Sequence, residues 1–456
     1  MKLNSKKLQS NFVNFLILLL VFLGLPNPSQ QLIDKYIAIT LFSYVILTAS
    51  KSLGINKYYQ GLILSIGGLT YYLFNIANFA MIILGTGFGF LLHFTIIFIN
   101  KKINNPNIIP IFVILLLFII SSIINSVKLR TYLSTDPPLS QYTHDMGLYL
   151  KTYYLMGNYD YYHAHAVAFQ NHAVPISPPA DVWSWRLPTA FYLWKLIPGI
   201  NGLNIYLFYV AFATLALLAT YQIAKKIKVS QTLAIIPVYL LYSYLHFAAY
   251  DWTLLQIEWW AAFFVIFGLY FLFDNKENYA ITFFSLAAIT REQLFIPFLM
   301  IALIATIYKN KHWQKFWVPV VCFGLMIIFH TYQISKIVNL QSGSQAFHFR
   351  LNGGMDLVNN TLAFGSWEYV FFAFKPFAIL FFINGLSLFI LKGKKQLMLL
   401  SFFSLPISYL IIGTSNINQA WGVLYIPIIL ISTIFTIKFL LNFNAKKLHL
   451  KYVNWN

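Results

Sequence analysis

A succession of apolar runs, each close to the length of a membrane crossing, is the sequence feature that most restricts the fold of this chain. A transmembrane helix needs about 20 mostly apolar residues. The chain has 59% hydrophobic and only 9% charged residues over 456 positions, whereas soluble proteins have roughly 25% charged residues. A soluble core cannot bury that much apolar surface. We therefore predict an all-α polytopic membrane protein, folded as a single domain over residues 1–456.

The runs predict a bundle of about 12–14 transmembrane helices. The first run follows several lysines but lacks the small residues of an A-x-A cleavage site, so we predict an uncleaved helix. Arg291 and Glu292 interrupt one long run, and each half is short for a crossing, so a turn is expected there. The runs are Phe12–Leu25, Ile37–Thr48, Gly61–Ile76, Ala80–Ile99, Ile108–Ile124, Ile205–Ile223, Leu233–Ala249, Trp252–Phe273, Tyr279–Tyr308, Phe316–Gln333, Tyr369–Leu391, Leu397–Ile412 and Gly422–Leu441.

Basic residues in the connections predict the orientation, because short cytoplasmic loops are rich in lysine and arginine. The net charge is +19, but the lysines are scattered singly or in small groups between apolar runs, which indicates a lipid bilayer and no nucleic acid as partner. We predict a multi-pass plasma-membrane protein with cytoplasmic N- and C-termini. Two long segments, about 128–198 and 334–367, then form extracytoplasmic loops, and loops of that length are usually functional.

The segment 141–198 concentrates histidines, carboxylates and aromatic residues in an otherwise apolar chain. Apolar and aromatic positions recur at helical spacing in 145–158 and 161–172, and a third short helix is expected at 188–196. We expect these helices to lie along the membrane surface, with their aromatic side chains at the level of the lipid headgroups.

The predicted topology places most carboxylates on or near one face of the membrane. Only Asp274 and Glu277 fall in cytoplasmic loops, and Asp34 lies near the first outside turn. A carboxylate in a membrane helix costs about 2.5–3.5 kcal/mol, so it usually pairs or lines a cavity. The sorting therefore predicts one polar cavity that opens outward. The residues on this face are Asp136, Asp145, Asp160, Asp181, Asp251, Glu258, Glu292, Asp356 and Glu368.

Three short motifs in this arrangement resemble those of the GT-C glycosyltransferases. The first is Thr-His-Asp-Met-Gly-Leu-Tyr at 143–149, early in the large loop; the second is Arg-Leu-Pro at 186–188, followed by Tyr-Leu-Trp at 192–194 and Pro-Gly at 198–199. The third is Thr-Arg-Glu-Gln at 290–293, before an apolar run that contains Pro297. The chain is most similar in style to protein mannosyltransferases and bacterial lipid-linked sugar transferases, although the acidic pair of the mannosyltransferase loop is His144-Asp145 here.

The resemblance implies a sugar donor linked to polyprenyl phosphate, an acceptor hydroxyl on a protein, lipid or glycan, and inversion at the anomeric carbon. Such an enzyme must deprotonate the acceptor and neutralise the departing phosphate. Asp145 is the candidate general base, since one positioned carboxylate can accept the proton. The competing interpretation is that Asp145 only caps the helix that begins at Met146.

Arginine is suited to the phosphate because its fork of donors matches phosphate oxygens. Arg291, which interrupts an apolar run, is the stronger candidate, and a simple ion pair with Glu292 is its alternative role. Arg186 and Arg350 are weaker candidates, as is Lys195, because a cation beside a membrane is commonly an anchor.

Four further residues are expected to bind substrate. Asp251 and Glu258 are two helical turns apart and share one helix face, where they can hold the acceptor or pair with a buried cation. His144 and Glu292 belong to the motifs that carry the resemblance.

A cofactor is not required by this chemistry, but a divalent metal is an option. His163 and His165 would lie on the same side of an extended chain, and imidazole suits zinc or manganese. The alternative is that both are hydrogen-bonded surface residues in a tyrosine-rich loop.

Two other classes of membrane protein compete with this interpretation. A transporter or flippase of a lipid-linked or small substrate would show an inverted repeat with broken helices near mid-membrane, and we find no such internal symmetry. A polysaccharide ligase or polymerase also has a large outside loop but typically late in the chain, whereas the large loop is early here.

Overall fold

The structure is a computed structural model that describes residues 5–24, 32–73, 77–102, 109–134, 145–170, 177–197, 202–250, 253–338, 351–364, 376–391, 393–414 and 418–444. Most of these residues lie in helices, and the described part of the chain is all-α as predicted. The described strands are two parallel two-residue segments, β1 (Leu351–Asn352) and β2 (Gly413–Thr414).

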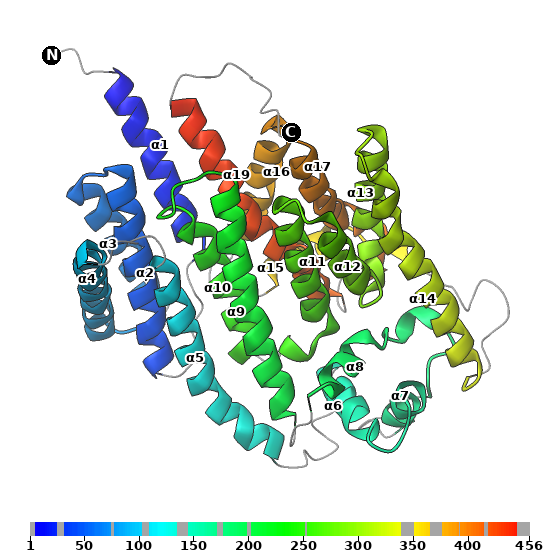
Figure 1. Ribbon diagram of the computed structural model, residues 1–456. Helices are drawn as coiled ribbons and strands as arrows, with labels where there is room; N and C mark the ends of the chain where they lie inside the picture. Colours follow the sequence, from blue (N-terminus) through cyan, green and yellow to red (C-terminus); the bar gives the residue numbers. More distant parts are fainter. Residues whose placement is uncertain are drawn as a thin grey trace.

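Five helices precede the large loop, and short helices fill the loop itself (Figure 1). The first five are α1 (Ser5–Phe22), α2 (Leu32–Leu53), α3 (Lys57–Leu73), α4 (Phe79–Lys102) and α5 (Ile109–Ser134). The loop contains α6 (Asp145–Leu155), α7 (Tyr161–Gln170), the 3-10 helix η2 (Val182–Ser184) and α8 (Thr189–Lys195). The three expected loop helices are confirmed, but α5 continues to Ser134 and so takes up residues that we expected to be loop from position 128 onward.

The second half of the chain alternates long helices with short 3-10 segments. These elements are α9 (Leu203–Lys226), α10 (Ile235–Tyr250), η3 (Thr253–Leu255), α11 (Ile257–Phe273), α12 (Glu277–Ala288), η4 (Glu292–Leu294), α13 (Phe295–Ile307), η5 (Trp313–Trp317), α14 (Val318–Ser335), α15 (Met355–Ala363), α16 (Pro376–Leu391), α17 (Lys394–Leu400), η8 (Ser401–Phe403), α18 (Ser404–Ser408), η9 (Gln419–Leu424) and α19 (Ile426–Asn444). Every predicted apolar run contains at least one helix, and the expected turn at Arg291 separates α12 from α13. Helix α15, inside the second expected loop, was not predicted.

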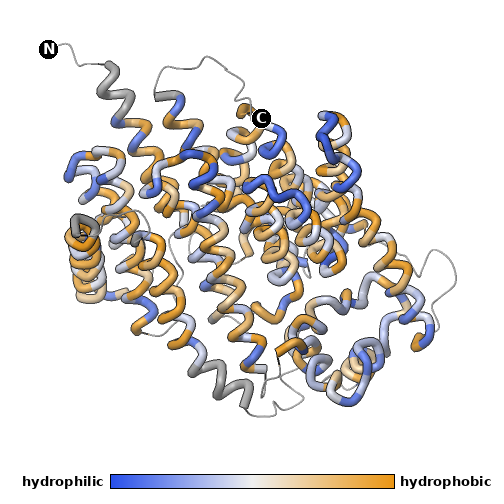
Figure 2. The backbone as a smooth tube through the Cα atoms, viewed as in Figure 1, coloured by the Kyte–Doolittle hydropathy of each residue, from blue (hydrophilic) through white to orange (hydrophobic). Residues whose placement is uncertain are grey.

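Five helices among the described residues are long and apolar enough to cross a membrane. They are Leu32–Leu53, Phe79–Ile99, Leu203–Lys226, Trp313–Ser335 and Gln419–Asn442. Shorter apolar helices of 10–17 residues accompany them, and hydrophobic residues run along the middle of the bundle (Figure 2). The chain is therefore a helical protein with segments suited to a membrane.

The two ends of the bundle differ in what they carry. Helix α1 begins and α19 ends at one end, whereas α6, α7 and α8 lie at the opposite end (Figure 1). At the end where α1 begins, Asp274 forms ion pairs with Lys226 and Lys276, and Lys395 donates a hydrogen bond to Asn275. These lysines come from loops that the sequence predicted on one side of the membrane.

A buried polar cluster ties α2, α5 and α10 together. Asp34 Oδ1 accepts a hydrogen bond from Ser121 Oγ at 2.5 Å and lies 3.0 Å from His246 Nε2. Asn125, one turn after Ser121, donates to the Ser121 carbonyl at 3.0 Å. Asp34 and His246 are both buried. Asp34 thus meets the expectation that an acidic residue within apolar helices has polar partners.

A backbone junction connects the second expected loop to the segment after α18. Gly353 N donates to Ile411 O and Gly354 N to Tyr409 O, each at 3.1 Å, beside the β1–β2 pair. A Cβ at Gly353 would lie 2.3 Å from Tyr409 O, so this close approach requires glycine. The junction fixes the segment 408–413, which forms one wall of the cavity described below.

Candidate active site

A cavity of about 610 Å³ lies between the loop helices and the bundle. Its wall comes from α6, α7, η2, η4, α13, α14, the segment 408–413 and η9. Polar side chains cluster in one part of the wall, namely Asp145, Asp181, Ser184, Arg186, Glu292 and Gln293. Apolar and aromatic side chains supply most of the remainder, including Phe169, Trp183, Phe295, Ile296, Phe323, Tyr409 and Trp421. An apolar cleft with a few convergent polar groups is the usual form of a ligand site.

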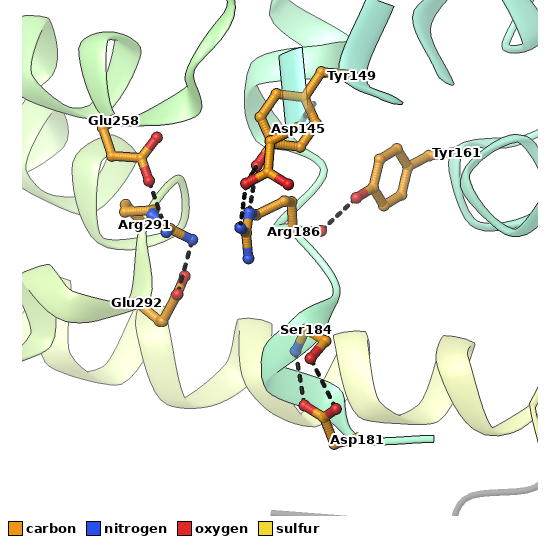
Figure 3. A network of polar contacts seen from close by, with 9 residues as sticks. All are labelled: Asp145, Tyr149, Tyr161, Asp181, Ser184, Arg186, Glu258, Arg291 and Glu292. Carbon is orange, nitrogen blue, oxygen red and sulfur yellow. Dashed lines mark hydrogen bonds and ion pairs between the residues drawn. The ribbon is translucent and has the colours of Figure 1, made fainter. Parts of the chain in front are cut away.

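Asp145, Tyr149 and Arg186 form a connected group at the polar part of the wall (Figure 3). Arg186 Nη2 donates to Asp145 Oδ2 at 3.2 Å, and Arg186 Nε donates to Tyr149 Oη at 2.6 Å. The Tyr149 hydroxyl donates in turn to Asp145 Oδ2 at 3.5 Å. The carboxylate is 58% exposed and the arginine side chain 17%. Asp145 therefore has one oxygen held by the protein, while Oδ1 has no partner among the described residues.

Helix α6 explains why Tyr149 reaches Asp145. The two residues are four positions apart, so they lie on the same face of the helix. Asp145 is the first residue of α6, where a negative charge is favoured by the helix dipole. Burial raises the pKa of Tyr149 above its ordinary value, so the phenol stays protonated and can donate.

Arg186 is positioned by the short segment around η2. Asp181 caps this 3-10 turn, with its carboxylate accepting from Ser184 N and Ser184 Oγ at 2.8 Å each. The Tyr161 hydroxyl on α7 donates to the Arg186 carbonyl at 2.5 Å. Burial would lower the pKa of Arg186, but Tyr149 and the nearby carboxylates raise it well above its ordinary value. The guanidinium is therefore a fixed charge on the cavity wall.

Arg291, the stronger phosphate candidate from the sequence, has a different location. Its side chain is 1% exposed and does not line the cavity. Nη2 lies 2.7 Å from Glu258 Oε1 on α11, and Nη1 donates to Glu292 Oε1 at 2.8 Å (Figure 3). The expectation that Arg291 meets the lipid phosphate is thus corrected to the alternative of an ion pair, because both carboxylates enclose it. Glu258 is likewise buried against Arg291, and Glu292 alone of the three faces the cavity.

The two histidines proposed for a metal point to different environments. They lie two positions apart on α7, a helix and not an extended chain, so their side chains are about 200° apart around its axis. His163 is exposed and paired with Asp160, whereas His165 is buried between Thr152 and the rings of Tyr161 and Trp185. Among the described residues no group of three or more histidine, cysteine or acidic side chains is arranged to hold a metal ion.

Several residues that the sequence suggested for the site are not among the described residues that line the cavity. His144, Asp251 and Arg350 lie outside the described residues. Lys195 lies 4.3 Å above the ring of Tyr153 and does not line the cavity. Asp160 accepts hydrogen bonds from the backbone N–H groups of Tyr162 and His163, so it caps the start of α7.

The aromatic side chains of α6 and α7 have a role that sequence reasoning missed. We expected them at headgroup level, but Tyr149, Tyr153 and Tyr161 are buried inside the protein. Tyr161 contacts Phe191 of α8, and Tyr153 contacts Trp194 of the same helix. The four-residue spacing from Asp145 to Tyr149 was the available signal for a bonded pair. Gln293 was also missed, since a glutamine beside a charged motif has no distinguishing pattern.

Comparison with models of protein families, with curated proteins and with solved structures finds no match to this chain.

Proposed function

We propose that this protein is an integral membrane glycosyltransferase of the GT-C kind. It would transfer a sugar from a polyprenyl-phosphate donor to an acceptor hydroxyl on a protein, lipid or glycan. The observation that carries the proposal is the composition of the cavity wall. An acidic group and a guanidinium lie together at one part, and side chains of apolar helices form another. A lipid-linked sugar phosphate has the same division into a polar head and an apolar chain.

In the proposed reaction Asp145 Oδ1 takes the proton of the acceptor hydroxyl. The acceptor oxygen attacks the anomeric carbon, the bond from that carbon to the phosphate oxygen breaks, and polyprenyl phosphate leaves with the electron pair. Direct displacement inverts the anomeric carbon. The geometry supports Asp145 as base because Arg186 and Tyr149 occupy only Oδ2, leaving the other oxygen open. A positioned base of this kind contributes about 10²–10⁴-fold in rate.

Arg186 is the proposed phosphate ligand among the described residues. Its Nε and Nη2 are used by Tyr149 and Asp145, while Nη1 has no partner in the described part of the chain. The same guanidinium would thus orient the base and bind the leaving phosphate, which suits the forked geometry of arginine. Arg350 stays a second candidate from the sequence.

The apolar part of the wall supports a binding place for the polyprenyl chain. Phe295 and Ile296 start α13, and Phe323 lies on α14, which belongs to a segment apolar enough to cross a membrane. The proposal includes a GT-C-like bundle of about 12–14 spans. It also places the termini in the cytoplasm and the loop helices on the extracytoplasmic face of the plasma membrane, following the positions of the lysines.

The first experiment measures release of free polyprenyl phosphate from a panel of polyprenyl-phosphate sugars, using purified protein in lipid discs with acceptors supplied. We expect protein-dependent release that falls by about 10²–10⁴-fold in Asp145→Asn. Asp181→Asn is the matched control, because asparagine also caps a helical turn. Absence of release by folded protein with every donor would refute the proposal and favour a transporter.

The orientation is tested by labelling single cysteines with an impermeant thiol reagent, after Cys322→Ala removes the natural cysteine. Gly157→Cys in the loop after α6 should react from outside the cell. Lys276→Cys, at the opposite end of the bundle, should react only after the membrane is opened. The reverse pattern would contradict the proposed active face.

A further inference from the structure

The cavity wall presents polar groups whose hydrogen-bonding capacity the described protein does not use. Gln293 Oε1 and His165 Nε2 are buried and have no hydrogen-bond partner among the described residues. Glu292 uses Oε1 for Arg291, while its second oxygen has no partner in the described part of the chain. Buried polar groups are normally hydrogen-bonded, so such groups in a cavity wall indicate a ligand that supplies the missing partners.

The hydrogen bonds of Thr152 define the state of His165. The Thr152 hydroxyl donates its proton to Leu148 O at 2.8 Å, so its oxygen must accept from His165 Nδ1–H at 2.8 Å. Burial, with the nearby charge of Arg186, lowers the pKa of His165 to about 3, so the ring is neutral. Nε2 is then an acceptor. His165 is one of the residues that line the cavity, whereas Thr152 is not.

The side chain of Glu292 is held by an ion pair with the buried residue Arg291. Arg291 is fixed between Glu258 and Glu292 and is itself 1% exposed. This ion pair uses Oε1 of Glu292 and leaves the other oxygen without a partner among the described residues, and the cavity wall contains Glu292 but not Arg291. Arg291 therefore acts as a positioning residue for Glu292.

We propose that Glu292, Gln293 and His165 form a hydroxyl-recognition subsite, and that the sugar it takes is neutral with unmodified hydroxyl groups. This inference rests on the proposed glycosyltransferase function and names the donor class. All three open groups accept hydrogen bonds, and sugar hydroxyls are the donors that match them. A uronic acid would instead bring a carboxylate toward Asp145, Asp181 and Glu292, which line the same cavity. Among the described residues that line the cavity, Arg186 Nη1 is an open cationic donor, and it is then available for the phosphate.

The test compares polyprenyl-phosphate hexose with the matching polyprenyl-phosphate hexuronate in the phosphate-release assay. We expect kcat/KM for the hexose to exceed that for the hexuronate by about 100-fold or more, because sites built to bind a hydroxyl reject analogues that leave their polar groups unpaired. A series of monodeoxy hexose donors then locates the recognised hydroxyl. Loss of that hydroxyl should lower kcat/KM by about tenfold or more in the wild type.

Variants connect this preference to the named residues. In Glu292→Gln and Gln293→Leu the sensitivity to the recognised hydroxyl should fall by at least about tenfold, as in a double-mutant cycle. Ser408→Ala is the matched control: Ser408 lines the same cavity, but its hydroxyl already donates to Leu405 O, so the preference should not change. Thermal unfolding of each variant verifies that it is folded.

The outcomes separate the two proposals. Release that is equally fast with hexose and hexuronate, or faster with an amino sugar, would overturn the neutral-sugar subsite while leaving the glycosyltransferase function intact. Unchanged sensitivity in Glu292→Gln and Gln293→Leu would overturn the assignment of these residues. No release from any donor would overturn both.

Discussion

Arg186 and Arg291 are both arginines in short connections next to acidic residues, yet they occupy opposite situations. Arg186 faces one carboxylate, lines the cavity and keeps a nitrogen without a partner among the described residues. Arg291 lies between two carboxylates, is 1% exposed and does not reach the cavity. A charge that interrupts an apolar run therefore indicates a structural ion pair as readily as a ligand site. Which role applies depends on the number of counter-charges that the fold brings to it.

Arg291 should be distinguished from Arg186 by how much it contributes to the stability of the fold. Arg291→Met leaves Glu258, 5% exposed, and Glu292 without their counter-ion, and breaking a buried ion pair by removing one partner costs about 3–5 kcal/mol. Unfolding of the purified protein in detergent should show this loss. Arg186→Met is the comparison, and an equal loss there would show that the two arginines do not differ in structural role.

Arg186 should be distinguished by activity. Arg186→Lys keeps the positive charge but removes the fork that contacts Tyr149, Asp145 and the proposed phosphate. We expect kcat/KM for phosphate release to fall by about 10–100-fold, the loss of one charge-assisted hydrogen bond of about 1.5–3 kcal/mol. The midpoint of thermal unfolding should stay close to that of wild type. Full activity of the lysine variant would remove the phosphate-binding role.

The dependence of stability on pH tests the environment of His165, which lines the cavity near Arg186. The folded pKa of His165 is lowered to about 3 by burial and by the charge of Arg186, below the ordinary value of 6.5. The unfolded chain therefore binds more protons between these values, and stability is full above pH 6.5 and decreases as the pH falls toward 3. The loss from this residue should be about 2 kcal/mol at pH 5. His165→Gln should flatten this part of the profile, and an unchanged profile would contradict the assignment.

The smallest effect is expected at the opposite end of the bundle. Lys226 pairs with Asp274 there, and its side chain is 49% exposed. Exposed ion pairs contribute about 0.2–1 kcal/mol, so Lys226→Ala should change stability by no more than that and leave phosphate release unaltered. A large loss of stability would show that this end, and not the Glu258–Arg291–Glu292 group, carries the principal ion pairs.

Much of the fold was readable because a helix in a membrane needs a long apolar segment. Each predicted run contains a helix, and the loop helices begin within a residue of their predicted starts. Three of the carboxylates predicted for one face, Asp145, Asp181 and Glu292, do line one cavity, while the face itself stays a prediction. The ion-pair role of Arg291 could not be predicted from the sequence. Glu258 and Arg291 lie far apart along the chain, yet their side chains are 2.7 Å apart in the structure. The metal hypothesis depended on an extended chain at His163 and His165, but these residues lie on helix α7, which points their side chains in different directions.

The buried cluster of Asp34, Ser121 and His246 has a consequence for biogenesis. Asp34 emerges from the ribosome 87 residues before Ser121 and 212 residues before His246. At a synthesis rate of about 5–20 residues per second, α2 waits about 10–40 s for its histidine partner. During that interval its carboxylate must remain near the interface or within the insertion machinery, since isolation in hydrocarbon is costly. We therefore expect Asp34 of α2 to gain its histidine partner, and the first half of the bundle to complete its polar contacts, only after α10 has been made.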